Sequence, residues 1–338
     1  MNQNYKTISL EKGMYLEKNK TFSEILEELD PTENYEGTSL FNMDAFQRQL
    51  KRFDIHVNGK NSDTVEKFFS TKDSQVLFPE YISRCIGGEI EEDQNSVKNL
   101  VANTIKIDNP AYKNVIIDHD KKDNEIKEIE EGNALPEINI SLKENNIKIK
   151  KIGFVLNASY EALQYQKLSV FNIFLKQIGI KFNKYLFQNA IKTIIDGDGN
   201  KNESTKINLK KEIKYGDLID IFIKLKPYNL TTIVVSPLAM QKILTISEFS
   251  QHQTGLNFQN TGSLNHLLGA KLICSTALKE TVIVALDKKF TLNYILAQNL
   301  NIESDKIIDK QLNQSVVTMR YAFSKLCKDA SIVTSVEG

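Results

Sequence analysis

The sequence predicts an α+β fold organised around one long helix. Three patterns carry this prediction: a strand-like alternation over 147–156, a helical periodicity over 168–195, and alternating short helices and strands over 205–305. Apolar residues of the long helix recur at intervals of three and four, and therefore share one face: Phe171, Phe174, Leu175, Ile178, Phe182, Tyr185 and Leu186. The Asp-Gly-Asp-Gly-Asn run at 196–200 predicts the end of this helix. Its expected length is about 40 Å.

The segment before the long helix predicts a strand followed by one short helix. The apolar alternation of the strand slips by one residue at Lys151, which indicates a bulge or a bend. Ser159 is the expected N-cap of the short helix, because a serine oxygen can accept a hydrogen bond from a free backbone N–H of the first turn.

Composition narrows the class of protein. The chain has 338 residues, 43 basic and 43 acidic side chains, and three cysteines outside any metal-binding spacing. This length can bury one large or two medium cores. Proteins that grip duplex DNA through its phosphates usually carry a basic excess, which is missing here. We expect reduced thiols, no signal peptide and no membrane span, since no apolar run approaches ~20 residues.

Residues 1–76 predict an arm of three short helices. Thr21 and Glu24 have the spacing of a capping box before the first helix, which must end by Pro31. Ser39 is the expected cap of the second helix, and Asp63-x-x-Glu66 is the expected start of the third.

The second arm helix is predicted to be amphipathic. Met43, Phe46 and Leu50 lie on one apolar stripe, with Phe53 continuing it. A basic trio lies on the other side: Arg48, Lys51 and Arg52. It either contacts nucleic acid or an acidic partner, or it is a solvated face or a salt-bridge donor.

The next two segments predict a helix and a long hairpin. Pro79 suits the first turn of a helix that should end at Gly87-Gly88. Residues 103–150 contain two apolar alternations, 115–117 and 138–142, separated by a long polar segment. Such a segment cannot bury enough surface to fold alone, so it is either a disordered loop or a loop ordered by a neighbour.

The region after the long helix predicts a second group of helices and strands. The expected helices are 217–224 and 237–244, the latter with Ser236 as N-cap and Pro237 at its first position. The expected strands are 231–235, 271–274, 281–286, 290–297, 317–323 and 331–336, with a turn at Leu268-Gly269-Ala270. A Gln/Asn-rich loop at 245–263 is either a ligand lid or a subunit-contact loop.

No pattern in the sequence predicts catalysis, a cofactor or a metal site. Asp196, Asp198 and Asn200 imitate the start of a calcium loop, but Lys201 and Ile207 stand where that loop needs Gly and a bidentate Glu. The four histidines are isolated, and no phosphate-binding glycine loop or nucleophile motif occurs. A soluble enzyme with a lid at 245–263 stays open as a minor alternative.

The order of these features resembles the major capsid proteins of tailed phages, the Hong Kong 97 fold. The resemblance lies in EGNALPEINISLKENNIKIKKIGFVLNASYEAL, followed by a long helix that ends in DGDG. It covers roughly residues 77–336. The implied organisation is an N-terminal arm (1–102), an extended hairpin loop (103–150), a peripheral domain with the spine helix (151–204 and 306–338), and an inserted axial domain (205–305). The resemblance implies that the last two strands return to the spine domain.

The resemblance also implies a function. Hexamers and pentamers of the chain would form an icosahedral phage head around double-stranded DNA, without sequence-specific contacts, in a virion assembled in the bacterial cytoplasm. Portal and scaffolding proteins are implied partners, with decoration proteins an open option. The alternative on the same fold is an encapsulin-type compartment that holds cargo enzyme.

Subunit contacts are expected at the arm and at the hairpin tip. The apolar stripe of Met43, Phe46 and Leu50 is one candidate, because helices this short need packing partners. The acidic tip residues Glu128, Glu130 and Glu131 are the other. Lysines at the hairpin base lie too far away to pair with them, at about 40 Å against a Debye length of ~8 Å, so a neighbouring subunit is the expected source of positive charge.

Overall fold

The computed structural model describes residues 6–17, 20–92, 95–117, 128, 140–142, 144–209, 212–247, 266–278 and 281–336. The chain forms two compact units. Unit 1 comprises Met1–Glu92, Lys151–Phe182 and Asn299–Met319, and unit 2 comprises Asp93–Lys150, Asn183–Gln298 and Arg320–Gly338. Three long elements, α5 (Leu168–Asp196), β12 (Leu292–Ile307) and β13 (Leu312–Lys325), contribute residues to both.

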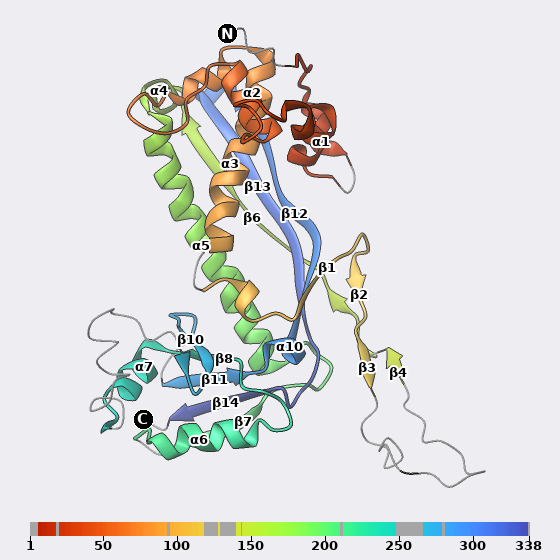
Figure 1. Cartoon of the computed structure of the whole chain (residues 1–338), viewed down its shortest axis with the longest axis vertical. Helices are drawn as coiled ribbons and strands as arrows, with labels where there is room; N and C mark the ends of the chain where they lie inside the picture. The colour runs from red at the N-terminus through yellow and green to blue at the C-terminus, as the bar shows by residue number, and fades with distance from the viewer. Residues whose placement is uncertain are drawn as a thin grey trace, which may run out of the picture. The chain divides into compact units, whose positions relative to one another are not determined.

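Unit 1 combines the arm with two long helices and a sheet. Its further elements are η1 (Lys12–Leu16), α1 (Phe22–Leu29), η2 (Thr32–Tyr35), α2 (Ala45–Arg52), η3 (Val65–Phe69), α3 (Lys72–Glu92), β6 (Lys150–Ser159), α4 (Tyr160–Tyr165) and η6 (Ile308–Lys310). Strand β13 lies between β12 and β6, and the first half of α5 runs along this sheet (Figure 1).

One hydrophobic core holds unit 1 together. Leu175 of α5, Ile82 of α3 and Val317 of β13 belong to it, and each is fully buried. The arm joins the same core through residues such as Phe22 and Phe68. The arm is therefore folded against its own unit.

The two long helices of unit 1 approach closely at Gly179. A Cβ added to this glycine would lie 2.8 Å from the backbone oxygen of Ile86 and 2.9 Å from the Cβ of Glu89. Helix α3 therefore passes α5 at a distance that only glycine permits.

Several local predictions for unit 1 are confirmed. The capping box of Thr21 and Glu24 opens α1, and Ser159 caps α4. Helix α5 begins at Leu168 and ends at Asp196, one residue beyond the prediction. Val317 and Met319 are buried in β13, as the alternation requires.

Three boundary predictions in the arm and the following helix are wrong. Helix α3 begins at Lys72 and continues through Gly87-Gly88 to Glu92, because packing against α5 outweighs the low helix propensity of glycine. Helix α2 is capped by Asp44, not by Ser39. The third arm helix is only the 3₁₀ turn η3.

Unit 2 contains a six-stranded sheet and the root of the hairpin. Its elements are η4 (Val97–Asn99), β1 (Asn103–Lys106), β2 (Ala111–Tyr112), β3 (Val115–Ile117), β4 (Ile140–Leu142), β5 (Ile147–Lys148), β7 (Thr205–Leu209), α6 (Tyr215–Lys224), β8 (Thr232–Val235), α7 (Pro237–Leu244), β9 (His266–Leu267), β10 (Ala270–Cys274), β11 (Val282–Leu286), α10 (Lys288–Thr291) and β14 (Ser331–Val336).

The six-stranded sheet has the order β7-β14-β11-β8-β10-β9. Helices α6 and α7 cover one face, where Leu218 and Ile243 pack with Ile233 of β8. Val234 points to the other face and is also fully buried, so β8 is covered on both sides. The predicted N-cap at Ser236 is confirmed.

The turn at Leu268-Gly269 follows the sequence prediction, whereas the slip at Lys151 and the place of strand β14 differ from what the sequence predicted. Leu268 and Gly269 both have positive φ, 51° and 79°, and form the two-residue turn between β9 and β10. The slip at Lys151 marks a change of partner: β5 pairs with β2, whereas β6 pairs with β13. Strand β14 was expected to return to the spine domain, but it lies between β7 and β11.

No helix among the described residues combines the length and the apolar character that crossing a membrane requires.

Candidate assembly surfaces

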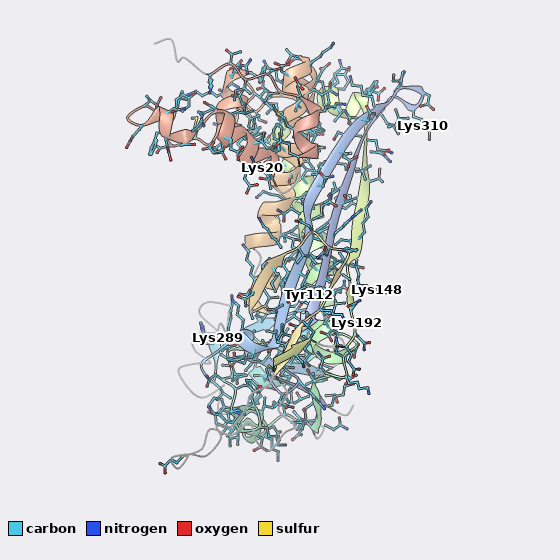
Figure 2. All side chains as sticks on the ribbon, turned by 90° about the vertical axis from the view of Figure 1, so that its right-hand side faces the viewer. Lys20, Tyr112, Lys148, Lys192, Lys289 and Lys310 are labelled. Atoms are coloured by element: carbon cyan, nitrogen blue, oxygen red, sulfur yellow. The ribbon has the colours of Figure 1, made fainter. Side chains whose placement is uncertain are left out.

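The root of the extended hairpin is fixed to the end of α5. The backbone N–H of Asn145 donates to Asn200 Oδ1 at 3.1 Å, and Asn145 Nδ2 donates to the carbonyl of Gly199 at 2.8 Å. Strands β2 and β5 pair at this root, with Ala111 opposite Lys148 and Tyr112 opposite Ile147; Figure 2 labels Tyr112 and Lys148 on these strands. The hairpin continues as the antiparallel pair β3 and β4, which confirms the predicted hairpin arms.

The loop after α5 is a hydrogen-bonded helix stop. Gly197 and Gly199 have φ of +79° and +93°, in the left-handed region that glycine tolerates. The Asp198 carboxylate accepts hydrogen bonds from Asn200 Nδ2 at 2.9 Å and from the backbone N–H of Lys325 at 2.8 Å. Asp198 thus ties the end of α5 to β13.

A buried lysine, which sequence reasoning missed, completes this junction. Lys325 is fully buried, and its Nζ donates to the carbonyl of Ile194 at 2.7 Å and to Ser204 Oγ at 2.8 Å. Ile194 lies in the last turn of α5, where carbonyls lack helical partners and the helix dipole favours positive charge. The sequence did carry a signal for this burial. Position 325 is odd-numbered like the inward-facing positions 317, 319, 321 and 323, so the alternation of the strand directs its side chain inward.

The predicted acidic tip is only partly described. Glu128 is exposed, whereas Glu130 and Glu131 lie outside the described residues. A contact of the tip with a neighbouring subunit stays a prediction.

The predicted apolar stripe of the arm is used largely inside unit 1. Phe46 and Leu50 are buried in the core of the unit, and the guanidinium of Arg84 lies 4.3 Å from the centre of the Phe46 ring. Met43 is half-buried. The side chains of Phe46 and Leu50 therefore contact their own chain, and a subunit contact at the stripe stays a prediction.

The basic trio of α2 contains a buried ion pair. Arg48 is fully buried; its Nε donates to Asp30 at 2.9 Å, and its Nη2 lies 3.3 Å from Glu27. The guanidinium also lies 4.5 Å from the centre of the Tyr35 ring. Of the two interpretations left open, salt-bridge donation describes Arg48, while Lys51 is exposed.

A tyrosine of the arm replaces a helical hydrogen bond in α3. Pro79 lies inside α3, where its ring prevents the regular ladder. The hydroxyl of Tyr15 donates to the carbonyl of Val76 at 2.8 Å and accepts from the backbone N–H of Glu80 at 3.1 Å. These two backbone groups would otherwise bond each other directly. Tyr15 therefore fastens the N-terminal segment to α3.

No three His, Cys, Asp or Glu side chains lie together as a metal site within the described part of the chain. A cavity of about 490 Å³ in unit 2 opens beside α6 and α7, with this lining: Glu212, Ile213, Lys214, Tyr215, Lys242, Thr245, Ile246 and Ser247.

Comparison with solved structures identifies the class of fold. No protein-family model and no curated protein matches the chain. The virus-like particle from Pyrococcus furiosus matches with a TM-score of 0.53 at 12% identity, over 76% of this chain and 99% of its own. The capsid of the cyanophage P-SCSP1u matches with a TM-score of 0.51 at 14% identity, over 71% of this chain and 88% of its own. The SrpI encapsulin complex from Synechococcus elongatus PCC 7942 matches with a TM-score of 0.50 at 11% identity, over 72% of this chain and 88% of its own.

The chain has the Hong Kong 97-like capsid fold, so the resemblance seen in the sequence is confirmed at the level of the fold. At identities this low, the fold is what the chain shares with these proteins.

Proposed function

We propose that this chain is the major capsid protein of a tailed phage or a prophage. Its copies would assemble as hexamers and pentamers into an icosahedral head around double-stranded DNA. One observation carries the proposal: about three quarters of the chain superimposes on subunits of particles, among them a phage capsid. Fold alone does not define function, so particles made of this chain have to be isolated.

The proposed organisation follows the four parts predicted from the sequence. The arm (1–102) and the hairpin (103–150) reach neighbouring subunits, and the spine domain (151–204 and 306–338, without β14) forms the wall. The axial domain (205–305), whose sheet β14 joins, surrounds the capsomer axis. Contacts that persist in such a shell bury about 2,000 Å² or more in total. Portal and scaffolding proteins are the expected further partners.

Particle isolation tests this function. Purified chain should sediment as capsomers, shells or tubes, and electron microscopy should show icosahedral particles. Particles from the native host should protect double-stranded DNA from nuclease. A protein cargo in place of DNA would instead identify an encapsulin-type compartment. The SrpI encapsulin is similar in fold to this chain. A chain that stays monomeric at all concentrations would refute both.

A further inference from the structure

The outer face of α5 in unit 1 carries an apolar stripe that no element of its own chain covers among the described residues. Ile173, Phe174 and Ile180 keep 55%, 53% and 47% of their surface exposed, and Val170 extends the same face. Val170 precedes Ile173 and Phe174 by three and four residues, and Ile180 follows Ile173 by seven, so the four side chains extend over about 15 Å of helix. A contiguous exposed patch of this kind marks a binding surface more often than isolated exposed residues do.

The charged residues that α5 itself contributes beside the stripe are all lysines. Between Glu161 and Asp196 the chain has no acidic residue and five lysines. Lys176, next to the stripe, forms an ion pair with Glu89 at 2.9 Å. Lys181 is exposed and has no ion-pair partner among the described residues. The surface therefore suits a partner that is apolar and acidic.

The arm of the same chain has the complementary chemistry. Residues 22–36, which form α1 and η2, contain six acidic residues and no basic one. Glu27 and Asp30 pair with Arg48, and Glu28 pairs with Lys20 at 2.6 Å, whereas Glu33 and Glu36 face solvent. Leu29 adds an exposed apolar side chain to this acidic surface.

The arm cannot reach the stripe of its own chain without leaving its place. Helix α3 binds α1 through Arg84, whose guanidinium donates to Ser23, and it binds α5 through Ile86 at Gly179. Residues two positions apart in a helix point in nearly opposite directions, so at the level of Arg84 and Ile86 the helices α1 and α5 contact different faces of α3. Figure 1 shows α3 between them.

We propose that the α5 stripe of one copy binds the α1–η2 surface of a second copy. The two surfaces differ and lie on different sides of α3, so the contact is head-to-tail, and repeating it closes a ring or extends an array. This inference rests on the proposed shell function and assigns one of its contacts. Because lysines and carboxylates face each other at its rim, the contact weakens as salt rises.

Two exposed apolar residues of unit 1 provide a matched test. Phe174→Glu puts a charge into the stripe, and Val155→Glu puts the same charge on β6, where Val155 is 52% exposed. Both variants should melt at the temperature of the wild type. We expect the assembled fraction of Phe174→Glu to fall about tenfold, and that of Val155→Glu to stay within about twofold. Normal assembly of Phe174→Glu, or equal loss in both variants, overturns the contact.

Charge reversal gives a second test that does not alter the apolar stripe. Lys181→Glu alone and the pair Glu33→Lys with Glu36→Lys should each reduce assembly at low salt. The two changes combined in one chain should restore it, because attraction returns with reversed sign. If the combined variant assembles worse than either, the two surfaces do not meet.

Cross-linking of mixed particles identifies the occupant. Unlabelled and heavy-isotope-labelled copies are co-assembled and treated with a carbodiimide, which joins touching amines and carboxylates. We expect mixed-isotope peptides that join Lys181 to residues 24–36. Links from Lys181 only within one copy, or only to another acidic protein of the particle, overturn this contact and leave the shell function intact. A wild type that forms no particle refutes both.

Discussion

Replacing Tyr15 with phenylalanine tests whether the arm is locked to α3 by one hydroxyl. That hydroxyl bridges the carbonyl of Val76 and the N–H of Glu80 across the turn that contains Pro79. Phenylalanine keeps the ring, which stacks on Phe22 with centroids 4.3 Å apart. The substitution therefore removes the two hydrogen bonds and little else.

The expected cost follows from the two backbone groups left behind. Each buried donor or acceptor that loses its partner costs about 1–3 kcal/mol. Part of this is recovered if α3 tightens, so that Glu80 N–H approaches Val76 directly. We expect Tyr15→Phe to lower the free energy of unfolding by about 2 kcal/mol.

Pro79→Ala supplies the control. Without the proline ring, α3 can close its own ladder, and the hydroxyl of Tyr15 becomes dispensable. In that background Tyr15→Phe should cost less than about 0.5 kcal/mol, which gives a coupling of about 1.5 kcal/mol between the two positions.

Urea unfolding of the dissociated subunit measures all four members of this cycle. An equal cost of Tyr15→Phe in both backgrounds would refute the reasoning, because the hydroxyl would then act independently of the proline. Hydrogen exchange at the Glu80 amide adds a local readout: protection should fall in Tyr15→Phe and return in the double variant.

Three further predictions concern packing, alkaline pH and thiol reactivity. Gly179→Ala should destabilise the subunit by about 1–3 kcal/mol, because the added methyl group clashes with Ile86. Gly87→Ala in α3 should stabilise it by about 0.5–1 kcal/mol, because an added Cβ there meets nothing within 4 Å and alanine favours the helix. Urea unfolding that ranks the two variants the other way would contradict the packing of α3 on α5. Burial raises the pKa of Tyr15, Tyr81 and Tyr294 above the ordinary tyrosine range, so the folded state keeps these protons to higher pH than the unfolded state does. The free energy of unfolding should therefore be level below about pH 9 and decline as pH rises past about 10. A level profile to about pH 11 would contradict the burial of these hydroxyls. Burial raises the pKa of Cys85 to about 11, so a thiol reagent at about pH 8 should modify exposed Cys274 long before Cys85, as mass analysis of peptides would reveal; equal rates would show that Cys85 is accessible.

Elements with local signals were predicted well because their hydrogen bonds close within a few residues. The capping box at Thr21 and Glu24 and the Ser236-Pro237 start of α7 need only a short stretch of chain to form. The length of α5 followed in the same way from its periodicity and its glycine stop. The alternation in β13 identified its buried positions through the two-residue period of strands.

Elements that depend on distant partners were missed or misplaced. The Gly87-Gly88 pair is a strong local stop signal, yet α3 continues through it because α5 lies against the helix at Gly179. The apolar stripe of α2 predicted that this face packs against another surface, but not whether that surface belongs to the same chain or to a neighbour. In the structure, Phe46 and Leu50 lie in the core of their own unit. In α5 the periodicity also placed Phe174 and Tyr185 on the buried face, but these side chains are 53% and 48% exposed. Periodicity therefore indicates an apolar face of a helix, but not which part of it is buried or by what surface.

The sequence by itself determined α1, the short helix α4, α5, α6 and α7, most strands, the helix stop after α5 and, through their order, the capsid fold. Tertiary structure alone decided that Lys325 lies at the end of α5, that Tyr15 stands in for the bond that Pro79 opens, and that β14 joins the six-stranded sheet. The physical reason is the range of the interactions. Local backbone propensities act between neighbours in sequence, whereas a buried lysine or a bridging hydroxyl gains its partner only when segments more than fifty residues apart meet.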